Sequence, residues 1–248
     1  MHAIVDVGNS FIKVFVFENA QIIASYCYVP ADFFASLPHI FSTHSISRAI
    51  VSNVSDLQNV CQSIQRYVPV LNFLHSTPIP LANNYGTPHT LGLDRIAAAV
   101  GAEALQPRCH KLIIDAGTAI TIDYVSDSAA FEGGNISPGI ETRFRALHEF
   151  TGKLPKLSQT GTFSLIGKNT NEAIQNGVIQ GVLFEIQQYI QLYAEKFPKI
   201  TVFFTGGDAN FLGKNVNFFG KNIKNCIFAN VIAVGLQRIL EHNLNTLE

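Results

Sequence analysis

The chain has 248 residues, of which 47% are hydrophobic and 14% charged, with 17 basic and 18 acidic side chains. This nearly neutral balance, without a run of lysine or arginine, argues against a nucleic-acid-binding protein. No apolar run reaches the roughly 18 residues that span a bilayer, and the N-terminal MHAIVDVG lacks the pattern of a signal peptide. We therefore expect a cytoplasmic protein with neither nucleic acid nor membrane as a partner.

The first segment of the chain predicts two strands joined by a tight turn. Residues 3–17 (AIVDVGNSFIKVFVF) place an Asp-x-Gly turn between two apolar runs, which is the pattern of a β-hairpin. Gly8 would let backbone amides approach an anion, and Asn9 and Ser10 add short donors. Asp6 would repel a phosphate unless a divalent cation lay between them, so it is a candidate Mg²⁺ ligand. The alternative is an ordinary polar hairpin turn.

The following segments alternate between strand and helix patterns. Residues 47–54 (SRAIVSNV) predict a short strand, and a helical segment follows around 56–66. Residues 92–105 (GLDRIAAAVGAEAL) carry apolar side chains at helical spacing, with alanines suited to close packing. The pattern is then interrupted at Pro107.

The second half of the chain repeats the first hairpin. Residues 112–125 (LIIDAGTAITIDYV) contain the same Asp-x-Gly turn, and this segment starts 109 positions after the first copy. Two matching hairpins, one in each half, indicate a duplicated domain that could bind the phosphates of a nucleotide. We place the boundary near Pro107 and predict two domains, 1–109 and 110–248, with a last helix able to pack back across that boundary.

The remaining elements complete the pattern of an α/β protein. We expect one long helix or a helix pair over 170–196, a strand over 199–205 and a final helix over 228–240. The strand ends at Thr205-Gly206-Gly207-Asp208, where paired glycines would let a ribose or an adenine lie flat against the backbone. Hairpins followed by alternating helices and strands predict mixed sheets.

Two Asp-x-Gly hairpins followed by a Gly-Gly strand end resemble the superfamily of actin, hexokinase and Hsp70. Further blocks resemble the type III pantothenate kinases, in the same order, over residues 3 to about 210. These blocks are Gly92-Leu93-Asp94-Arg95, Asp115-Ala-Gly-Thr-Ala-Ile-Thr121, Gly133-Gly134-Asn-Ile-Ser-Pro138-Gly139, Ala146-Leu147 with Leu154-Pro155, and Gly167-Lys-Asn-Thr170 with Gly177 and Gly181. The resemblance implies a duplicated actin-like (ribonuclease H-like) fold, with two lobes that each contain a mixed β-sheet flanked by helices.

The resemblance also implies a reaction, the ATP-dependent phosphorylation of pantothenate to 4′-phosphopantothenate that opens coenzyme A biosynthesis. Asp94 matches the family's general base, while the residues alone also suggest a helix N-cap, a role that can coexist with catalysis. The implied substrate contacts are Tyr85, Gly92, Leu93, Asp94, Arg95 and Thr170. From sequence alone, Tyr85 is as readily a core residue beside a turn, and Thr170 a helix N-cap.

The family match further implies ATP with Mg²⁺, a monovalent cation (K⁺ or NH₄⁺) and a homodimer. Asp115 matches the monovalent-cation ligand, and Asp6 is assigned to Mg²⁺. The implied ATP contacts are Asp6, Val7, Gly8, Asn9, Ser10, Phe11, Ile12, Lys13 and Thr118. For Lys13, a solvent-facing position on the outgoing strand is the better expectation.

Two other functions are compatible with the same motifs. One is a sibling kinase of the superfamily that acts on a sugar or a carboxylate, and activity that survives Asp94→Asn would favour a carboxylate kinase, which needs no general base. The other is a non-catalytic ATP-binding regulator, which ATP binding without pantothenate turnover would favour.

Overall fold

The computed structural model describes residues 1–8, 10–161, 163–216 and 223–245 of the chain. The chain forms two compact units, and each contains residues that are distant in sequence. The first unit consists of Met1–Pro107, Ala129–Phe131 and Asn230–Glu248, and the second consists of Arg108–Ser128 and Glu132–Ala229. The last helix therefore belongs to the first unit, while the division into lobes at residue 109 stays a prediction.

The first unit is built on a five-stranded sheet with the order β3-β2-β1-β4-β5. Its strands are β1 (His2–Val7), β2 (Ile12–Glu18), β3 (Gln21–Tyr28), β4 (Arg48–Asn53) and β5 (Val70–Asn72). The first three strands form an antiparallel meander, whereas β4 runs parallel to β1 and β5 runs parallel to β4. The predicted first hairpin is confirmed.

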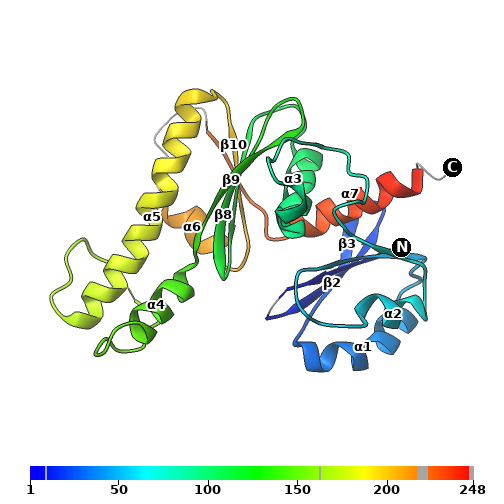
Figure 1. The fold of residues 1–248 in the computed structure, drawn as a ribbon, viewed down its shortest axis with the longest axis horizontal. Helices are drawn as coiled ribbons and strands as arrows, with labels where there is room; N and C mark the ends of the chain where they lie inside the picture. Colours follow the sequence, from blue (N-terminus) through cyan, green and yellow to red (C-terminus); the bar gives the residue numbers. More distant parts are fainter. Residues whose placement is uncertain (9, 162, 217–222, 246–248) are drawn as a thin grey trace. The chain divides into compact units, whose positions relative to one another are not determined.

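Helices cover both faces of this sheet (Figure 1). The helices are α1 (Pro30–Thr43), α2 (Val60–Gln65), α3 (Leu93–Leu105) and α7 (Val231–Asn245). Alternate side chains of β1, such as Ala3 and Val5, pack against α1 and α2, while α7 packs against β1 and both α3 and α7 pack against β4. A Cβ atom on Gly235 would overlap the Ala97 carbonyl oxygen, so glycine is what lets α3 and α7 approach so closely.

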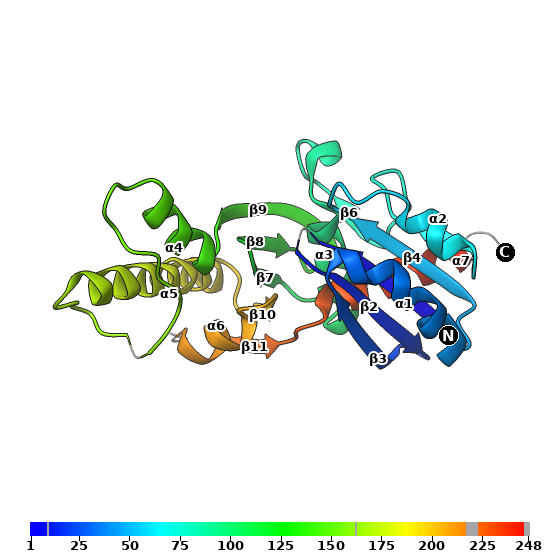
Figure 2. The ribbon, with the colours of Figure 1, turned by 90° about the horizontal axis from the view of Figure 1, so that it is seen from below.

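The second unit contains strands in the order β11-β10-β7-β8-β9 (Figure 2). Its elements are β7 (Lys111–Ala116), β8 (Ala119–Val125), β9 (Ala130–Pro138), β10 (Thr201–Thr205), β11 (Lys224–Ile227), α4 (Ile140–Glu149), α5 (Thr170–Lys196) and α6 (Ala209–Asn215). The β7–β8 hairpin is antiparallel, and β10 and β11 extend the sheet in parallel. The second hairpin and the α/β class with mixed sheets are thus confirmed.

A hydrophobic core lies on one face of the second sheet, beneath α4, α5 and α6. From α5, Ile179, Val182 and Ile186 are fully buried in it, whereas Phe184 and Leu192 are each 54% exposed. The segment 170–196 is therefore one helix, and most of its apolar side chains belong to the core of its own unit.

The first two residues of β9 belong to the first unit and pair with β6 (Ala82–Asn83), which precedes the 3₁₀-helix η1 (Pro88–Thr90). The register places Asn83 opposite Phe131. No local sequence signal indicates this pairing, which connects segments almost 50 residues apart.

Several predicted boundaries were wrong by a few residues. The strand over 199–205 begins at Thr201 because Lys199 has a left-handed backbone conformation, with φ of 70°. The final helix begins at Val231 rather than 228, because the Phe228 amide still donates to the Phe204 carbonyl oxygen next to β11 and a turn at 229–230 comes before the helix. The sequence pattern also missed β3 and α1. Among the described residues, no helix is long and apolar enough to cross a membrane.

Candidate functional site

The turn between β1 and β2 carries the first group of predicted site residues. The Gly8 amide donates to the Phe11 carbonyl oxygen at 3.0 Å and closes the turn. Ser10 is exposed and Phe11 is 51% exposed, so this part of the turn is open to solvent. Val7 and Ile12 flank the turn as buried core residues and contribute only backbone, and Asn9 lies outside the described residues.

Asp6 occupies an unusual electrostatic position at the end of β1. Its partner across the antiparallel pair is Lys13, which is exposed, as expected from the sequence. Burial raises the pKa of Asp6 to about 6, an effect that Lys13 partly offsets and that the nearby carboxylate of Asp94 reinforces. Two carboxylates near each other in a partly buried site form a region that favours a bound cation.

Asp94 lies in the first turn of α3, where Gly92 is the N-cap residue. Its Oδ1 accepts a hydrogen bond from the Arg95 amide at 2.9 Å, so the carboxylate is held at the helix N-terminus. The alternative that Asp94 itself is the N-cap is wrong, because the helix already begins at Leu93. A Cβ atom on residue 92 would overlap Asp94 Oδ1, and glycine therefore leaves room for the carboxylate.

Arg95 is only 5% exposed, although its guanidinium is charged. Its central carbon lies 5.6 Å from the centre of the Tyr85 ring and 5.7 Å from that of Phe131. The two rings meet edge to face, with centroids 6.0 Å apart. Cation–π contacts of this kind restrain the guanidinium plane, so Tyr85 helps to hold the Arg95 side chain in position. The sequence did not indicate Phe131, which arrives through the β6–β9 pairing.

The second Asp-x-Gly turn, between β7 and β8, is enclosed by its own unit. The Thr118 carbonyl oxygen accepts from the Gly139 amide at 3.0 Å and from the Thr142 hydroxyl at 2.7 Å. A Cβ atom on Gly139 would overlap the Gly117 carbonyl oxygen. The start of α4 is therefore docked on this turn, and the exposed Thr118 side chain points away from a fixed backbone.

The Gly-Gly element after β10 also contacts the second turn. Gly206 has φ of 88°, and a Cβ atom there would overlap Asp115 Oδ1 and the Ala116 carbonyl oxygen. The Asp208 amide donates to the same Ala116 oxygen at 3.1 Å. Burial, and then the nearby Glu141, raise the pKa of Asp208 above its usual range. Sequence reasoning assigned no role to Asp208 or Glu141, which meet only in the folded unit.

No group of three or more His, Cys, Asp or Glu side chains that could hold a metal occurs within the described residues. Asp6 and Asp115 are carboxylate residues on separate strands, β1 and β7. Their hard oxygen atoms suit Mg²⁺ and K⁺, and phosphate oxygens, backbone carbonyls and water commonly complete such shells.

Thr170 is the first residue of α5, and Asn169 is the N-cap. The Asn169 side chain accepts from the Glu172 amide at 3.0 Å, and the Glu172 carboxylate accepts from the Lys168 amide at 2.8 Å. The alternative that Thr170 is the N-cap is therefore wrong. Its exposed hydroxyl instead borders a groove of about 890 Å³. Apolar side chains of α4, of the segment that follows it and of α5 line much of that groove, among them Leu147, Phe150, Leu154, Ile174 and Val178.

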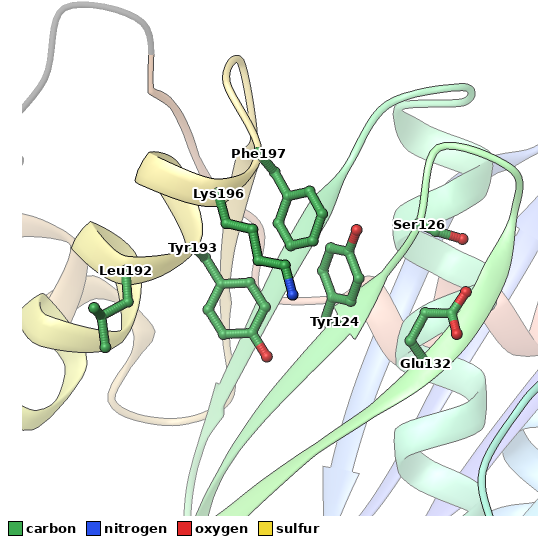
Figure 3. A pocket seen from close by; sticks show the side chains of 7 residues that line it. All are labelled: Tyr124, Ser126, Glu132, Leu192, Tyr193, Lys196 and Phe197. Carbon is green, nitrogen blue, oxygen red and sulfur yellow. The ribbon is translucent and has the colours of Figure 1, made fainter.

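A different pocket, of about 500 Å³, lies near the end of α5 (Figure 3). The Tyr124 and Phe197 rings stack with centroids 4.6 Å apart, and the Lys196 ammonium lies 5.3 Å from the Phe197 ring centre. The Tyr124 hydroxyl is 2.9 Å from His110 Nδ1, and burial is the main cause that raises the pKa of Tyr124 to about 12. None of the predicted site residues lines this pocket.

Comparisons with known proteins identify relatives over nearly the whole chain. Residues 3–192 match the model of a family described as type III pantothenate kinase. The type III pantothenate kinase of Phocaeicola vulgatus is 38% identical over 247 residues, covering 98% of this chain and 99% of that protein. The one from Porphyromonas gingivalis is 41% identical over 246 residues, covering 97% and 98%.

Solved structures resemble the chain more distantly. A Campylobacter jejuni protein described as a candidate transcriptional activator of the Baf family has a TM-score of 0.66 at 21% identity, covering 98% of this chain and 99% of that one. A candidate 2-dehydro-3-deoxygalactonokinase from Sinorhizobium meliloti has a TM-score of 0.62 at 12% identity, with the same coverage. At such identities the likeness concerns the fold alone, and it confirms the predicted duplicated actin-like fold.

Proposed function

The chain belongs to the type III pantothenate kinase family, and from this premise we propose that it uses ATP to phosphorylate pantothenate. The acceptor is the primary hydroxyl, the product is 4′-phosphopantothenate, and the reaction opens coenzyme A biosynthesis. The observation that carries this proposal is the full-length match to several pantothenate kinases at 38–41% identity. We place the reaction in the cytoplasm.

Asp94 acts as the general base in this proposal. Its carboxylate takes the proton of the primary hydroxyl while the hydroxyl oxygen bonds to the γ-phosphorus and the bond from that phosphorus to the β,γ-bridging oxygen breaks, releasing ADP. Support comes from the Arg95 amide at 2.9 Å and from the space left by Gly92, which together hold the carboxylate in one position. Positioning of this kind is the main protein contribution in phosphoryl transfer.

Arg95 and Tyr85 bind the pantothenate in this proposal, together with the backbone of Gly92 and Leu93. The guanidinium is restrained by two rings, so it can present planar donors to the substrate carboxylate or amide groups at low entropic cost. Thr170 is proposed as a further contact because its hydroxyl is not used by the cap of α5.

ATP binding is assigned to the two Asp-x-Gly turns. The backbone and hydroxyl groups from Asp6 to Lys13 and the Thr118 side chain are the proposed contacts. Asp6 would hold Mg²⁺ and Asp115 a monovalent cation, and these ions would supply charge neutralisation at the phosphates. The donor set fits this assignment, because both residues offer carboxylate oxygens beside glycine-containing turns.

A homodimer is also proposed, supported by exposed apolar side chains in the second unit. Phe150 is 85% exposed, Leu165 79% and Ile166 72%. Side chains this large and this exposed commonly mark an interaction surface when they gather on one unit.

One assay tests the central proposal: pantothenate-dependent release of ADP by wild-type protein, with and without K⁺. We expect turnover that requires Mg²⁺ and increases with K⁺. Asp94→Asn is expected to lower kcat by roughly 10²–10⁴-fold. Asp32→Asn, which changes an exposed acid in the first turn of α1, serves as a matched control and is expected to keep full activity.

Three outcomes would contradict parts of the proposal. Absence of turnover with every cation would refute pantothenate kinase activity, and ATP binding in that protein would point to a regulator. Turnover of a sugar or a carboxylate in place of pantothenate would identify a sibling kinase. Full activity of Asp94→Asn would refute the assignment of Asp94 as the general base.

A further inference from the structure

Ser52 is a buried residue of β4 whose hydroxyl has no hydrogen-bond partner among the described residues. The residue is 0% exposed. Buried polar groups are nearly always paired, because an unpaired one loses its contacts with water and gains nothing in return. An unpaired hydroxyl on an inner strand of a sheet therefore suggests a partner that arrives in another state of the protein.

The register of the sheet places Ser52 directly beside Asp6. Ser52 pairs with Asp6 across the parallel β4–β1 ladder, and Asp6 pairs with Lys13 across the antiparallel β1–β2 ladder. Side chains in register lie on the same face of a sheet. The three residues thus form a polar row across β4, β1 and β2, one residue before the ends of β1 and β4.

The same region contains the proposed catalytic carboxylate. Helix α3 packs against β4, and Asp94 lies in the first turn of that helix. Adjacent strands are separated by about 4.8 Å, so a rotation of the Ser52 side chain suffices to bring its hydroxyl within reach of the Asp6 carboxylate. A hydrogen bond to an ionised carboxylate is stronger than one between neutral groups.

We propose that Ser52 is a positioning residue for the complex of ATP with its divalent cation. Its hydroxyl donates to one oxygen of the ionised Asp6 carboxylate, which directs the other oxygen to the cation. This inference rests on the proposed function in one respect, namely that Asp6 is the magnesium ligand. The Ser52 hydroxyl is unpaired without Mg²⁺-ATP and paired when Mg²⁺-ATP is bound. The residue therefore lowers the stability of the free protein, and in the complex it fixes the Asp6 carboxylate.

The test is calorimetric titration of wild type and Ser52→Ala with ATP, once with Mg²⁺ and once with EDTA. We expect Ser52→Ala to bind Mg²⁺-ATP roughly tenfold more weakly and metal-free ATP with unchanged affinity. The free variant is expected to melt at the same temperature as wild type or higher, because an unpaired buried hydroxyl has been removed. Ser52→Thr, which keeps the hydroxyl, should restore tight binding.

Two controls separate positioning from a general structural effect. Ser126→Ala removes another buried hydroxyl, one that is 3.0 Å from Ser128 in the second unit, and should lower the melting temperature without changing the dependence of binding on Mg²⁺. In an Asp6→Asn background, Ser52→Ala should have no further effect on binding.

The outcomes divide cleanly. A Ser52→Ala protein that binds Mg²⁺-ATP as wild type does, or that loses metal-free ATP equally, would overturn the inference, as would a lower melting temperature. Wild type that binds Mg²⁺-ATP but turns over no pantothenate would refute the proposed function while leaving the role of Ser52 supported by its own titrations.

Discussion

The chain contains two Asp-x-Gly turns that are similar in sequence and differently supported in the structure. The first turn, after β1, exposes Ser10 and Phe11, and its carboxylate has Lys13 across the strand pair and Asp94 nearby. The second turn, after β7, is enclosed by glycines from two other segments, Gly139 and Gly206. The same motif is therefore surrounded by charged side chains in the first turn and by a tightly packed backbone in the second.

This difference separates two ways in which a fold supports a turn. The first turn holds one carboxylate, that of Asp6, whose ionisation is opposed by its burial, so this turn carries an electrostatic cost in the free protein. The second turn has its backbone fixed by close contacts, so its groups are placed before any ligand binds. Substitutions that add a side chain in the second turn should therefore lower the free energy of unfolding, whereas substitutions of charged residues in the first turn should change its dependence on pH.

The largest expected effect on stability comes from Gly139→Ala. Residue 139 has φ of −66°, which alanine adopts readily, but the added Cβ would overlap the Gly117 carbonyl oxygen. We expect a loss of roughly 3 kcal/mol in the free energy of unfolding, measured with urea. Gly8→Ala is the matched substitution in the first turn. Its Cβ would lie 3.3 Å from the Phe11 oxygen, and the cost should stay under about 1 kcal/mol. Equal losses would refute the difference between the turns.

The next effect concerns catalysis, and it comes from Gly92→Ala. The new Cβ would displace the Asp94 carboxylate, and a shift of about 1 Å in a reacting group can lower kcat by roughly 100-fold. The unfolding free energy should change little, because a side-chain end can move aside. Gly86→Ala is the control, since nothing lies within 4 Å of its added Cβ. Retention of kcat in Gly92→Ala would show that the carboxylate position is not critical.

A third prediction uses the pH dependence of the first turn. The pKa of Asp6 is raised from 3.8 to about 6 in the folded protein, so the folded state binds more protons than the unfolded state between these values. The stabilising effect of the neutral carboxyl is complete below pH 3.8 and is lost as the pH rises through about 6.

Asp6→Asn removes the free-energy cost of ionising a buried carboxyl. Without nucleotide or Mg²⁺, the variant should be more stable than wild type by roughly 2–3 kcal/mol at pH 8, with the difference vanishing near pH 4. Urea unfolding across this range measures it, and Asp32→Asn is the control. A difference that does not depend on pH would contradict the prediction.

The smallest expected effect comes from Lys13→Met. Because the ammonium of Lys13 lowers the pKa of Asp6, its removal should move the Asp6 titration upward by less than about one pH unit. Carbon NMR of the Asp6 carboxyl measures this midpoint. Arg48→Gln, at the far end of β4, should leave the midpoint unchanged, and a downward shift in Lys13→Met would be inconsistent with the charge arrangement.

How far the sequence could predict each element depended on the range of the interactions that define it. Both hairpins, α3 and α5 were predictable because their apolar periods and turn residues are local. The strand β3 and helix α1 were missed, and α1 contains an internal proline, Pro38, which ordinarily argues against a helix. The start of α3 at Leu93 also decided against Asp94 as a cap, a one-residue distinction beyond what pattern reading resolves.

By itself, the sequence determined the motifs on which the proposed site rests: two Asp-x-Gly turns, the Gly92–Arg95 block and the glycines that recur after them. Tertiary structure alone decided what each of these residues contacts. Strand pairing brought Phe131 to Arg95 and Ser52 to Asp6, and close packing brought Gly139 to Gly117. The physical reason is that period and turn chemistry are properties of neighbouring residues, whereas registers and close contacts arise between segments that only the folded chain brings together.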